Sequence, residues 1–325
     1  MTIRSKETIL MDNRGVSIII CCYNSSKKLP ETLTHLSKQI IPKGCAAEII
    51  IVDNNSTDNT SNFALKVWNE LNRKDIQLKV IVELSAGLNK ARMAGTASAK
   101  YDYILFCDDD NWLPNDYVKN AIKNLEMYPS LGIVGAANVH GKYEIKPPKW
   151  FLEFKEFCCI YEEGNMDKID LKGDQSIFVP GAGMFIYKKI ILEYFDNENK
   201  NNMILDRVED NLFSGGDTDI NLFNFEKGYG IGIFSDMRFT HFIPKERIKK
   251  KYLKKMAYCQ SFSSVIVATK NNLSLSRWST SGILKYYFTL LLKGSFFKIQ
   301  IAYLQTKGAN DAFNHLKKAQ SLNVL

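Results

Sequence analysis

Short apolar runs alternate with helix-like segments through the first 135 residues of this chain. The apolar runs are nearly continuous, as in parallel strands buried on both faces, and the segments between them carry apolar or small residues at helical spacing. The expected strands are residues 16–20, 48–52, 78–82, 103–107 and 133–137. The expected helices are residues 30–39, 62–71, 87–99 and 115–127. Strands separated by helices predict a doubly wound, mostly parallel α/β sheet.

The pattern is weaker in the middle of the chain. Residues 140–174 are irregular and rich in aromatic side chains, which fits a mixed sheet edge or a loop over a cleft. Two further strands are expected at residues 176–180 and 184–187, joined by Gly181-Ala182-Gly183. With 325 residues, the chain is long enough for one large domain with an appendage.

Carboxylates follow two of the predicted strands. Asp53 ends the second run, and Asp108, Asp109 and Asp110 end the fourth. Ligands of doubly wound sheets bind at these carboxyl ends, which favours one shared site. Because side chains alternate along an extended chain, Asp108 and Asp110 point to one side and Asp109 to the other. Two carboxylates on one side can bind a hard divalent cation with a phosphate, whereas the alternative is a solvated turn that caps the next helix.

Five segments resemble motifs of the family 2 inverting glycosyltransferases. In chain order they are similar to that family's opening strand, nucleotide-base loop, glycine-and-arginine helix, metal-binding DxD motif and catalytic-base segment. The segments are VSIIICCYN (16–24), IIVDNNSTD (50–58), GLNKARMAG (87–95), FCDDD (106–110) and GGDTDI (215–220). Gly228-Tyr229-Gly230 and Phe239-Thr240-His241 follow in the usual order. The resemblance covers roughly residues 15–245, and it is specific because five motifs occur in the right order and spacing.

The resemblance implies a GT-A type α/β fold of the nucleotide-diphospho-sugar transferase kind over residues 1–244, with residues 245–325 as a basic helical extension. It implies an enzyme that moves a sugar from a nucleotide-diphosphate sugar, most often a UDP-sugar, to an acceptor hydroxyl with inversion. The implied cofactor is Mn²⁺ or Mg²⁺. The implied acceptor is a glycan or a lipid-linked sugar in cell-surface polysaccharide or glycolipid synthesis.

The same resemblance assigns Asp108 and Asp110 to the metal, which would neutralise the departing diphosphate. Asp109 would face the sugar or ribose hydroxyls, so Asp108 and Asp109 both belong to the donor site. His241 is a candidate metal or phosphate ligand, although a lone histidine is more often structural.

Asp217 is the predicted general base, which would deprotonate the acceptor hydroxyl as it attacks the anomeric carbon. Asp219 lies two residues on, so it would not share the helix face of Asp217 and would instead stabilise the helix start. The family more often has Glu immediately before the base, where this chain has Gly216. That departure puts the local geometry of the base in doubt.

Four other residues are candidates for the donor site: Cys22, Tyr23, Asp53 and Arg92. Tyr23 could stack on the nucleobase, and its alternative role is ordinary packing at a strand end. Asp53 could accept a hydrogen bond from a uracil-like imide, and its alternative role is an Asx-turn. Arg92 could pair with the diphosphate or ribose, and its alternative is a solvated charge on a helix.

The C-terminal extension carries the positive charge of the chain. Residues 245–325 hold 15 of the 43 Lys and Arg residues but only 2 of the 35 Asp and Glu residues. Basic, aromatic-rich helices of this kind suit an anionic membrane surface, and the alternative is that they pack on the catalytic domain. Nucleic acid is not the expected partner, although lysines alone do not distinguish it from anionic lipid. The sequence leaves the oligomeric state open.

The cysteines and the N-terminus bear on the compartment. The chain has 7 cysteines, an odd number, and none is in CxxC spacing, so reduced, mostly buried thiols are expected. Residues 1–14 lack an apolar stretch of signal-peptide length, and no apolar run is long enough to span a membrane. The sequence thus predicts a cytoplasmic protein, with the inner face of the membrane as a site of peripheral binding.

Two alternatives to a glycosyltransferase remain at this level. A nucleotidyltransferase also uses an α/β sheet and metal-binding carboxylates, but it would need a glycine-rich phosphate loop where this chain has residues 21–26, CCYNSS. A degenerate sugar-nucleotide domain could serve as a non-catalytic adaptor at an anionic surface. Retention of Asp53, Asp108, Asp110 and Asp217 argues against that decay.

Overall fold

The computed structural model describes residues 12–174, 176–201, 207, 211–273, 289 and 296–321. Within them ten strands form one sheet, in the order β3-β2-β1-β4-β9-β6-β10-β5, with β7 beside β6 and β8 beside β10. The strands are β1 (Gly15–Cys22), β2 (Ala46–Asp53), β3 (Gln77–Val82), β4 (Tyr103–Phe106), β5 (Asn111–Trp112), β6 (Leu131–Tyr143), β7 (Tyr161–Glu162), β8 (Lys168–Asp170), β9 (Phe185–Tyr187) and β10 (Gly230–Ile243).

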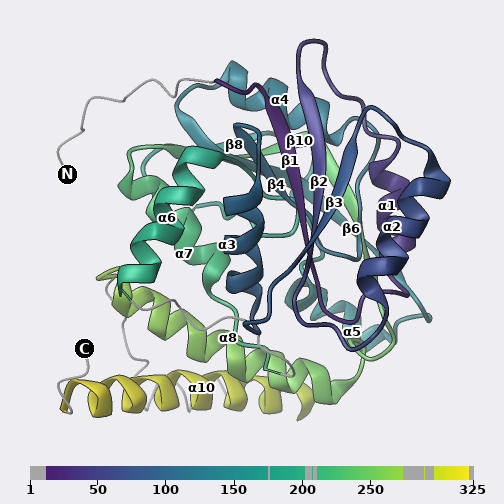
Figure 1. Cartoon of the computed structure of the whole chain (residues 1–325). Helices are drawn as coiled ribbons and strands as arrows, with labels where there is room; N and C mark the ends of the chain where they lie inside the picture. The colour runs from purple at the N-terminus through teal and green to yellow at the C-terminus, as the bar shows by residue number, and fades with distance from the viewer. Residues whose placement is uncertain are drawn as a thin grey trace.

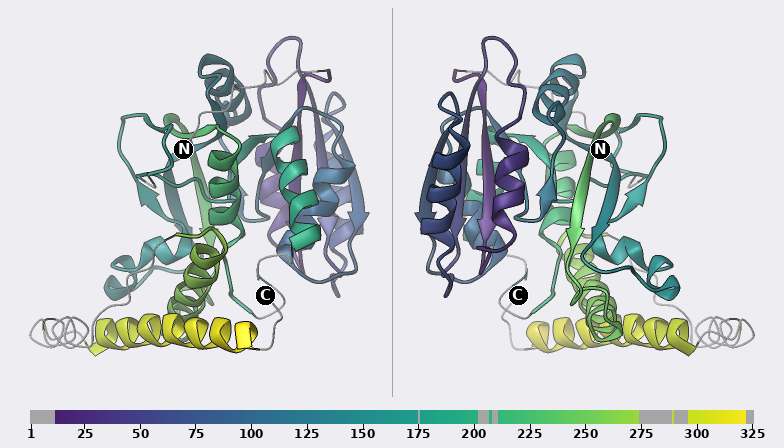
Figure 2. Two further views of the ribbon diagram at one scale, coloured as in Figure 1. Left: turned by 90° about the vertical axis from the view of Figure 1, so that its left-hand side faces the viewer. Right: turned by 90° about the vertical axis from the view of Figure 1, so that its right-hand side faces the viewer.

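The helices cover both faces of the sheet. They are α1 (Leu29–Leu36), α2 (Thr60–Leu71), α3 (Leu88–Ser98), α4 (Tyr117–Met127), α5 (Lys149–Leu152), α6 (Lys188–Asn201), α7 (Gly216–Glu226), α8 (Lys250–Lys270) and α10 (Phe296–Ser321), with a 3-10 helix η1 (Lys155–Cys158). Helices α1 and α2 lie on one side of strands β1 to β3, and α3 and α6 lie on the other (Figures 1 and 2). The chain therefore has the doubly wound α/β fold that the sequence predicts.

The sheet is mostly parallel at its centre. β1 pairs in parallel with β2 and β4, β2 with β3, and β6 with β10. The short β9 is antiparallel to both β4 and β6. The core side chains of β1 and β2, such as Ile18, Ile20 and Ile50, are fully buried because helices cover both faces.

The expected elements of the first 135 residues occur within a few residues of their predicted bounds, except that β6 extends to Tyr143. The predicted strand at residues 176–180 is wrong. Val179 is fully buried, but the side chain of Asn221 on α7 bonds both its N–H (3.3 Å) and its C=O (2.8 Å). An amide side chain thus takes the place of a neighbouring strand, so an apolar, extended segment does not join the sheet.

The C-terminal extension packs on the rest of the molecule. Leu253 and Ala257 of α8 are buried in a cluster with Phe151, Ile160 and Ile243. Helix α10 runs along α8 beneath the sheet (Figure 1). Within the basic, aromatic-rich extension, residues 274–288, 290–295 and 322–325 lie outside the described residues.

The packing of α8 and α10 agrees with the second of the two roles that the sequence left open for the extension. Among the residues that the structure describes, no helix is long and apolar enough to cross a membrane. Binding to an anionic membrane surface stays a prediction.

Candidate active site

A cavity of about 610 Å³ opens at the carboxyl ends of the parallel strands. Its volume lies in the range of sites that hold small molecules and cofactors. Its walls come from the end of β1, the start of α3, the acidic triplet, the 3-10 helix η1 with Cys159 after it, the start of α7, and α8. Of the residues predicted for the site, it is lined by Cys22, Tyr23, Arg92, Asp108, Asp109, Asp110, Asp217 and His241. Residues distant in the sequence therefore meet in one place.

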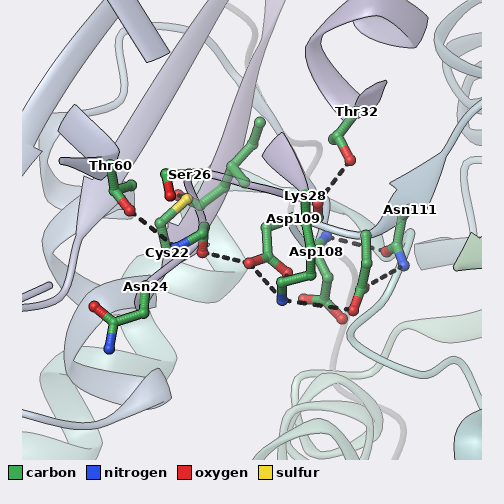
Figure 3. Close-up of polar contacts among 12 residues, drawn as sticks. Cys22, Asn24, Ser26, Lys28, Thr32, Thr60, Asp108, Asp109 and Asn111 are labelled. Atoms are coloured by element: carbon green, nitrogen blue, oxygen red, sulfur yellow. Dashed lines mark hydrogen bonds and ion pairs between the residues drawn. The ribbon is translucent and has the colours of Figure 1, made fainter. Parts of the chain in front are cut away.

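Asp109 is held by the turn between β1 and α1. Its carboxylate lies 2.7 Å from the Lys28 ammonium and accepts a hydrogen bond from the Ser25 hydroxyl. The Thr32 hydroxyl donates to its backbone carbonyl at 2.8 Å (Figure 3). Both carboxylate oxygens thus have protein partners, and Lys28 balances the charge.

Asp110 turns instead toward the C-terminal half of the chain. Its Oδ1 is 3.3 Å from His241 Nε2, and its Oδ2 is 3.2 Å from an Arg247 guanidinium nitrogen. Asp110 is 1% exposed, and burial opposes its ionisation. Arg247 and His241 outweigh burial and hold the pKa of Asp110 well below its usual range. The carboxylate is therefore ionised at neutral pH.

The pairing of β5 with β10 brings His241 to Asp110. Asn111 and His241 face each other across that antiparallel pair, and the N–H of Phe242 donates to the backbone carbonyl of Asp110 at 2.8 Å. The two residues of β5, directly after the acidic triplet, thus pair with the strand that carries His241 and bring this histidine next to Asp110.

The chemistry of these side chains fits a hard divalent cation. Two carboxylates and an imidazole, from Asp108, Asp110 and His241, line one cavity. His241 Nδ1 is a buried polar atom that makes no hydrogen bond among the described residues, which is the condition of an atom that awaits a ligand, whereas Asp110 Oδ2 has the Arg247 guanidinium as its charged partner at 3.2 Å. Among the described residues, no three or more His, Cys, Asp or Glu side chains are already grouped closely enough to hold a metal ion. The positive charge beside the triplet comes instead from Lys28, which pairs with Asp109, and from Arg247, which pairs with Asp110.

Asp217 lies in the first turn of α7, after the N-cap Gly215. Its Oδ1 is 2.6 Å from Arg92 Nη1, and the guanidinium of Arg92 also lies over the Phe106 ring at 5.1 Å. Burial opposes ionisation of Asp217, but Arg92 and a hydrogen bond with the backbone of Gly181 lower its pKa below the ordinary value. Arg92 is only 2% exposed, so the alternative of a solvated charge is wrong.

Gly181 gives a first prediction, because a Cβ atom at this position would overlap Arg92 Nη2 and Asp217 Oδ1. We expect Gly181→Ala to displace the pair and to lower kcat for sugar transfer by about 10-fold to 100-fold, the cost of moving a reacting group by about 1 Å. The matched control is Gly135→Ala, whose Cβ would instead crowd the Val179 side chain. That control should lower Tm but not the kcat of the folded enzyme. Equal kcat losses in both variants would contradict the prediction.

The predicted base-binding residues differ in their placement. Tyr23 is 48% exposed on the cavity wall, a position compatible with stacking on a base. Cys22, at the end of β1, is buried. Asp53 does not line the cavity: its carboxylate accepts hydrogen bonds from the N–H of Ser56, three residues on (2.9 Å), and from the Ser61 hydroxyl, so it holds the local turn as in its alternative role. The next residue, Asn54, lines the cavity at the position that was predicted for Asp53.

Sequence reasoning missed Asn54, Lys28 and Arg247. The Asn54 amide donates to the carbonyls of Glu83 (2.9 Å) and Ser85 (2.8 Å) and accepts from the Gly87 N–H (2.8 Å). It therefore fixes the loop that leads into α3 and Arg92. Lone cations and amides carry no periodic signal, and only their position next to a motif could have pointed to them.

Comparisons with known proteins bear on the activity. The family model described as "Glycosyl transferase family 2" matches residues 17–195. The poly(ribitol-phosphate) β-N-acetylglucosaminyltransferase TarS of Staphylococcus aureus is 34% identical over 114 residues, which are 35% of this chain and 19% of TarS. The corresponding S. aureus enzyme TarP is 26% identical over 202 residues, 62% of this chain and 56% of TarP. The chain thus spans a fifth to about half of the length of these relatives.

Solved structures show the same fold. The mannosyltransferase PcManGT from Pyrobaculum calidifontis, in complex with GDP-Man and Mn²⁺, gives a TM-score of 0.56 at 18% identity, over 95% of this chain and 76% of that one. S. aureus TarS 1–349 in complex with UDP-GlcNAc gives a TM-score of 0.50 at 18% identity, over 95% and 92% of the two chains. The GT-A type fold is thereby confirmed. Since the family model matches more than half of its residues, the chain belongs to glycosyl transferase family 2.

Proposed function

We propose that the protein transfers a sugar from a nucleotide-diphosphate sugar, a UDP-sugar in the first instance, to a hydroxyl of a cell-surface polymer, with inversion and with a divalent metal. The observation that carries this proposal is the meeting of Asp217 with the acidic triplet and His241 around one cavity. Related proteins act on poly(ribitol-phosphate) or make poly-β-1,6-N-acetyl-D-glucosamine, which supports a polyhydroxyl polymer as the acceptor class.

The charges of the cavity support the metal. Five carboxylates line it, from Asp108, Asp109, Asp110, Glu156 and Asp217, against four cations, from Lys28, Arg92, Arg207 and Arg247. A lining that is negative by one charge repels a diphosphate, and one divalent cation reverses that sign.

Asp108, Asp110 and His241 are the residues that would hold the metal. When bound there, a divalent cation supplies Lewis-acid stabilisation of the negative charge on the departing diphosphate. Lys28 and Arg247 add fixed positive charge beside Asp109 and Asp110 and so favour the same developing charge.

Asp217 performs the proton transfer in this proposal. The acceptor oxygen forms its bond to the anomeric carbon while the bond from that carbon to the diphosphate oxygen breaks, and the hydroxyl proton passes to the Asp217 carboxylate. Attack from the face opposite the leaving group inverts the anomeric configuration. Arg92 keeps Asp217 ionised and oriented, because its guanidinium is buried against Phe106 and cannot turn to solvent.

A thermal-shift panel of nucleoside diphosphates and nucleotide sugars, with and without Mn²⁺ or Mg²⁺, tests the donor. We expect a rise in Tm with a uridine compound that requires the metal, since ligand binding stabilises the folded state. The free sugar and the metal alone serve as controls. No shift with any nucleotide, in either condition, would contradict the proposed donor class.

A further inference from the structure

Asp219 is a buried carboxylate for which the transfer step has no use. It lies two residues after Asp217 in the first turn of α7 and is only 2% exposed. Its oxygens accept hydrogen bonds from the Tyr194 hydroxyl (2.8 Å), the Lys270 ammonium (2.7 Å) and the Asn271 amide (2.8 Å). An unpaired carboxylate at this depth would be costly, so the three donors fix Asp219 and with it the first turn of α7.

Two of these three donors come from the C-terminal extension. Lys270 is the last residue of α8, and Asn271 follows it. Tyr194 comes from α6. The helix that carries the predicted base is therefore anchored to α8.

The segment that leads into α7 is attached to α8 as well. The Ser214 N–H donates to the Ser263 hydroxyl at 3.1 Å, and the Phe213 ring packs on Phe262 with 5.0 Å between the ring centroids. Ser263 and Lys270 are seven residues apart, which places them on one face of α8, two turns from each other. That face contacts both the approach to α7 and its first turn.

The other end of α8 reaches the metal end of the cavity. Arg247, three residues before α8 begins, forms the ion pair with Asp110 at 3.2 Å. Between these ends Tyr252, Gln260 and Ser264 of α8 line the cavity. The segment from Arg247 to Asn271, with α8 at its centre, thus runs from the acidic triplet to the helix that carries the predicted base.

Helix α10 supports α8 from the outer side. Gly308 lies so close to the backbone of Tyr258 that a Cβ atom there would overlap the Tyr258 carbonyl. The Tyr258 hydroxyl donates to Asp311 at 2.9 Å, and Ala312 is fully buried against Phe262. Close packing of this kind leaves α8 little freedom to shift.

We propose that Asp219 and Lys270 are positioning residues of the transfer reaction, and that α8 fixes the position of Asp217 relative to Asp110. The inference rests on the proposed function, because it takes Asp217 as the base. The catalytic unit then extends to Asn271, beyond the boundary at residue 244 that the sequence predicts. The C-terminal extension is part of the active site and not an appendage that could be removed.

The test compares steady-state transfer from a UDP-sugar by the full chain and its variants Lys270→Met and Lys270→Arg, with Lys251→Met as the control on the exposed side of α8. For Lys270→Met we expect kcat to fall by about 10-fold to 100-fold while KM for the donor stays within about twofold, because only the base is displaced. Lys270→Arg should recover most of kcat, and Lys251→Met should match the wild type. The ratio of donor hydrolysis by water to sugar transfer should rise in Lys270→Met and in none of the other proteins compared.

A purely structural role predicts a different result. Lys270→Met would then lower Tm but leave kcat per folded molecule and the ratio of hydrolysis to transfer unchanged, which would overturn the proposal. If Lys270→Met does not fold, Asn271→Ala keeps the ion pair and removes the hydrogen bond to Asp219 together with one to the Val267 carbonyl (2.9 Å), so kcat should fall by about threefold with KM unchanged. A wild-type kcat in Asn271→Ala would also overturn the proposal.

A wild-type chain that transfers no sugar contradicts the proposed function itself, whereas an active wild type with fully active variants contradicts this inference alone.

Discussion

Replacing Asp217 by asparagine is expected to lower kcat for sugar transfer by about 10²-fold to 10⁴-fold, the usual contribution of a general base. Asparagine has nearly the same shape but cannot take up the acceptor proton. Donor binding should change by no more than about twofold, because the amide still fills the space beside Arg92. Steady-state kinetics, together with the metal-dependent shift in Tm on donor binding, measure the two effects separately. Near-normal turnover would place the base elsewhere.

The ion pair with Arg92 gives the same residue a distinctive pH dependence. The pKa of Asp217 lies below its ordinary value of 3.8, so the base stays deprotonated as the pH falls from 7 to about 5, and Asp217 should impose no loss of kcat in that range. In Arg92→Met, burial acts on Asp217 without its main opposing charge, its pKa rises, and the acid limb of the kcat profile should move to higher pH. An acid limb at the same pH in both proteins would show that the pair does not control the base.

The second large effect is expected at Asp110. Asp110→Asn removes one of the charges that would hold the metal, and we expect kcat/KM to fall by at least about 100-fold, in line with the several kcal/mol that a Lewis acid contributes. The Mn²⁺-dependent part of the donor thermal shift should disappear with it. His241→Gln should act in the same direction with a smaller loss.

The neighbouring Asp109 provides the matched comparison for Asp110. Asp109 is paired with Lys28 and Ser25, so Asp109→Asn leaves a partly buried ammonium without its nearest carboxylate and should lower Tm. It should leave a metal-dependent donor shift in place. If Asp109→Asn removes the metal dependence and Asp110→Asn does not, the roles within the triplet are the reverse of those proposed.

The half of the sheet formed by β1 to β4 could be predicted from the sequence because the hydrophobic patterns of these strands are local. The apolar runs at residues 16–20 and 48–52 are long enough to be read as buried strands, and β1 and β2 occur there. The prediction of a strand at residues 176–180 is wrong because an apolar pattern indicates that a segment is buried but not that it pairs with a strand. Val179 is buried, and its backbone bonds the Asn221 amide instead of a neighbouring strand.

The site was predictable in its residue types but not in its pairings. Asp110 and His241 are 131 residues apart in sequence, and only the register of β5 on β10 makes them neighbours. Arg92 was expected near phosphate or solvent, and its ion pair with Asp217 depends on how α3 and α7 meet. Family membership decides against the nucleotidyltransferase alternative, and the transfer activity, donor, metal and site roles are proposals that the variants above test.

The short strand β9 has a consequence for how the molecule forms during synthesis. Among the described strands, β9 (Phe185–Tyr187) alone joins β1 to β4, on one side, to β6 and β10 on the other. A nascent chain that has emerged only as far as β6 can complete the first half-sheet, but β6 has no place beside it until residue 187 is available. Release of β6 from the ribosome therefore precedes its docking by more than 40 residues of elongation, an interval in which its apolar face needs protection from other chains.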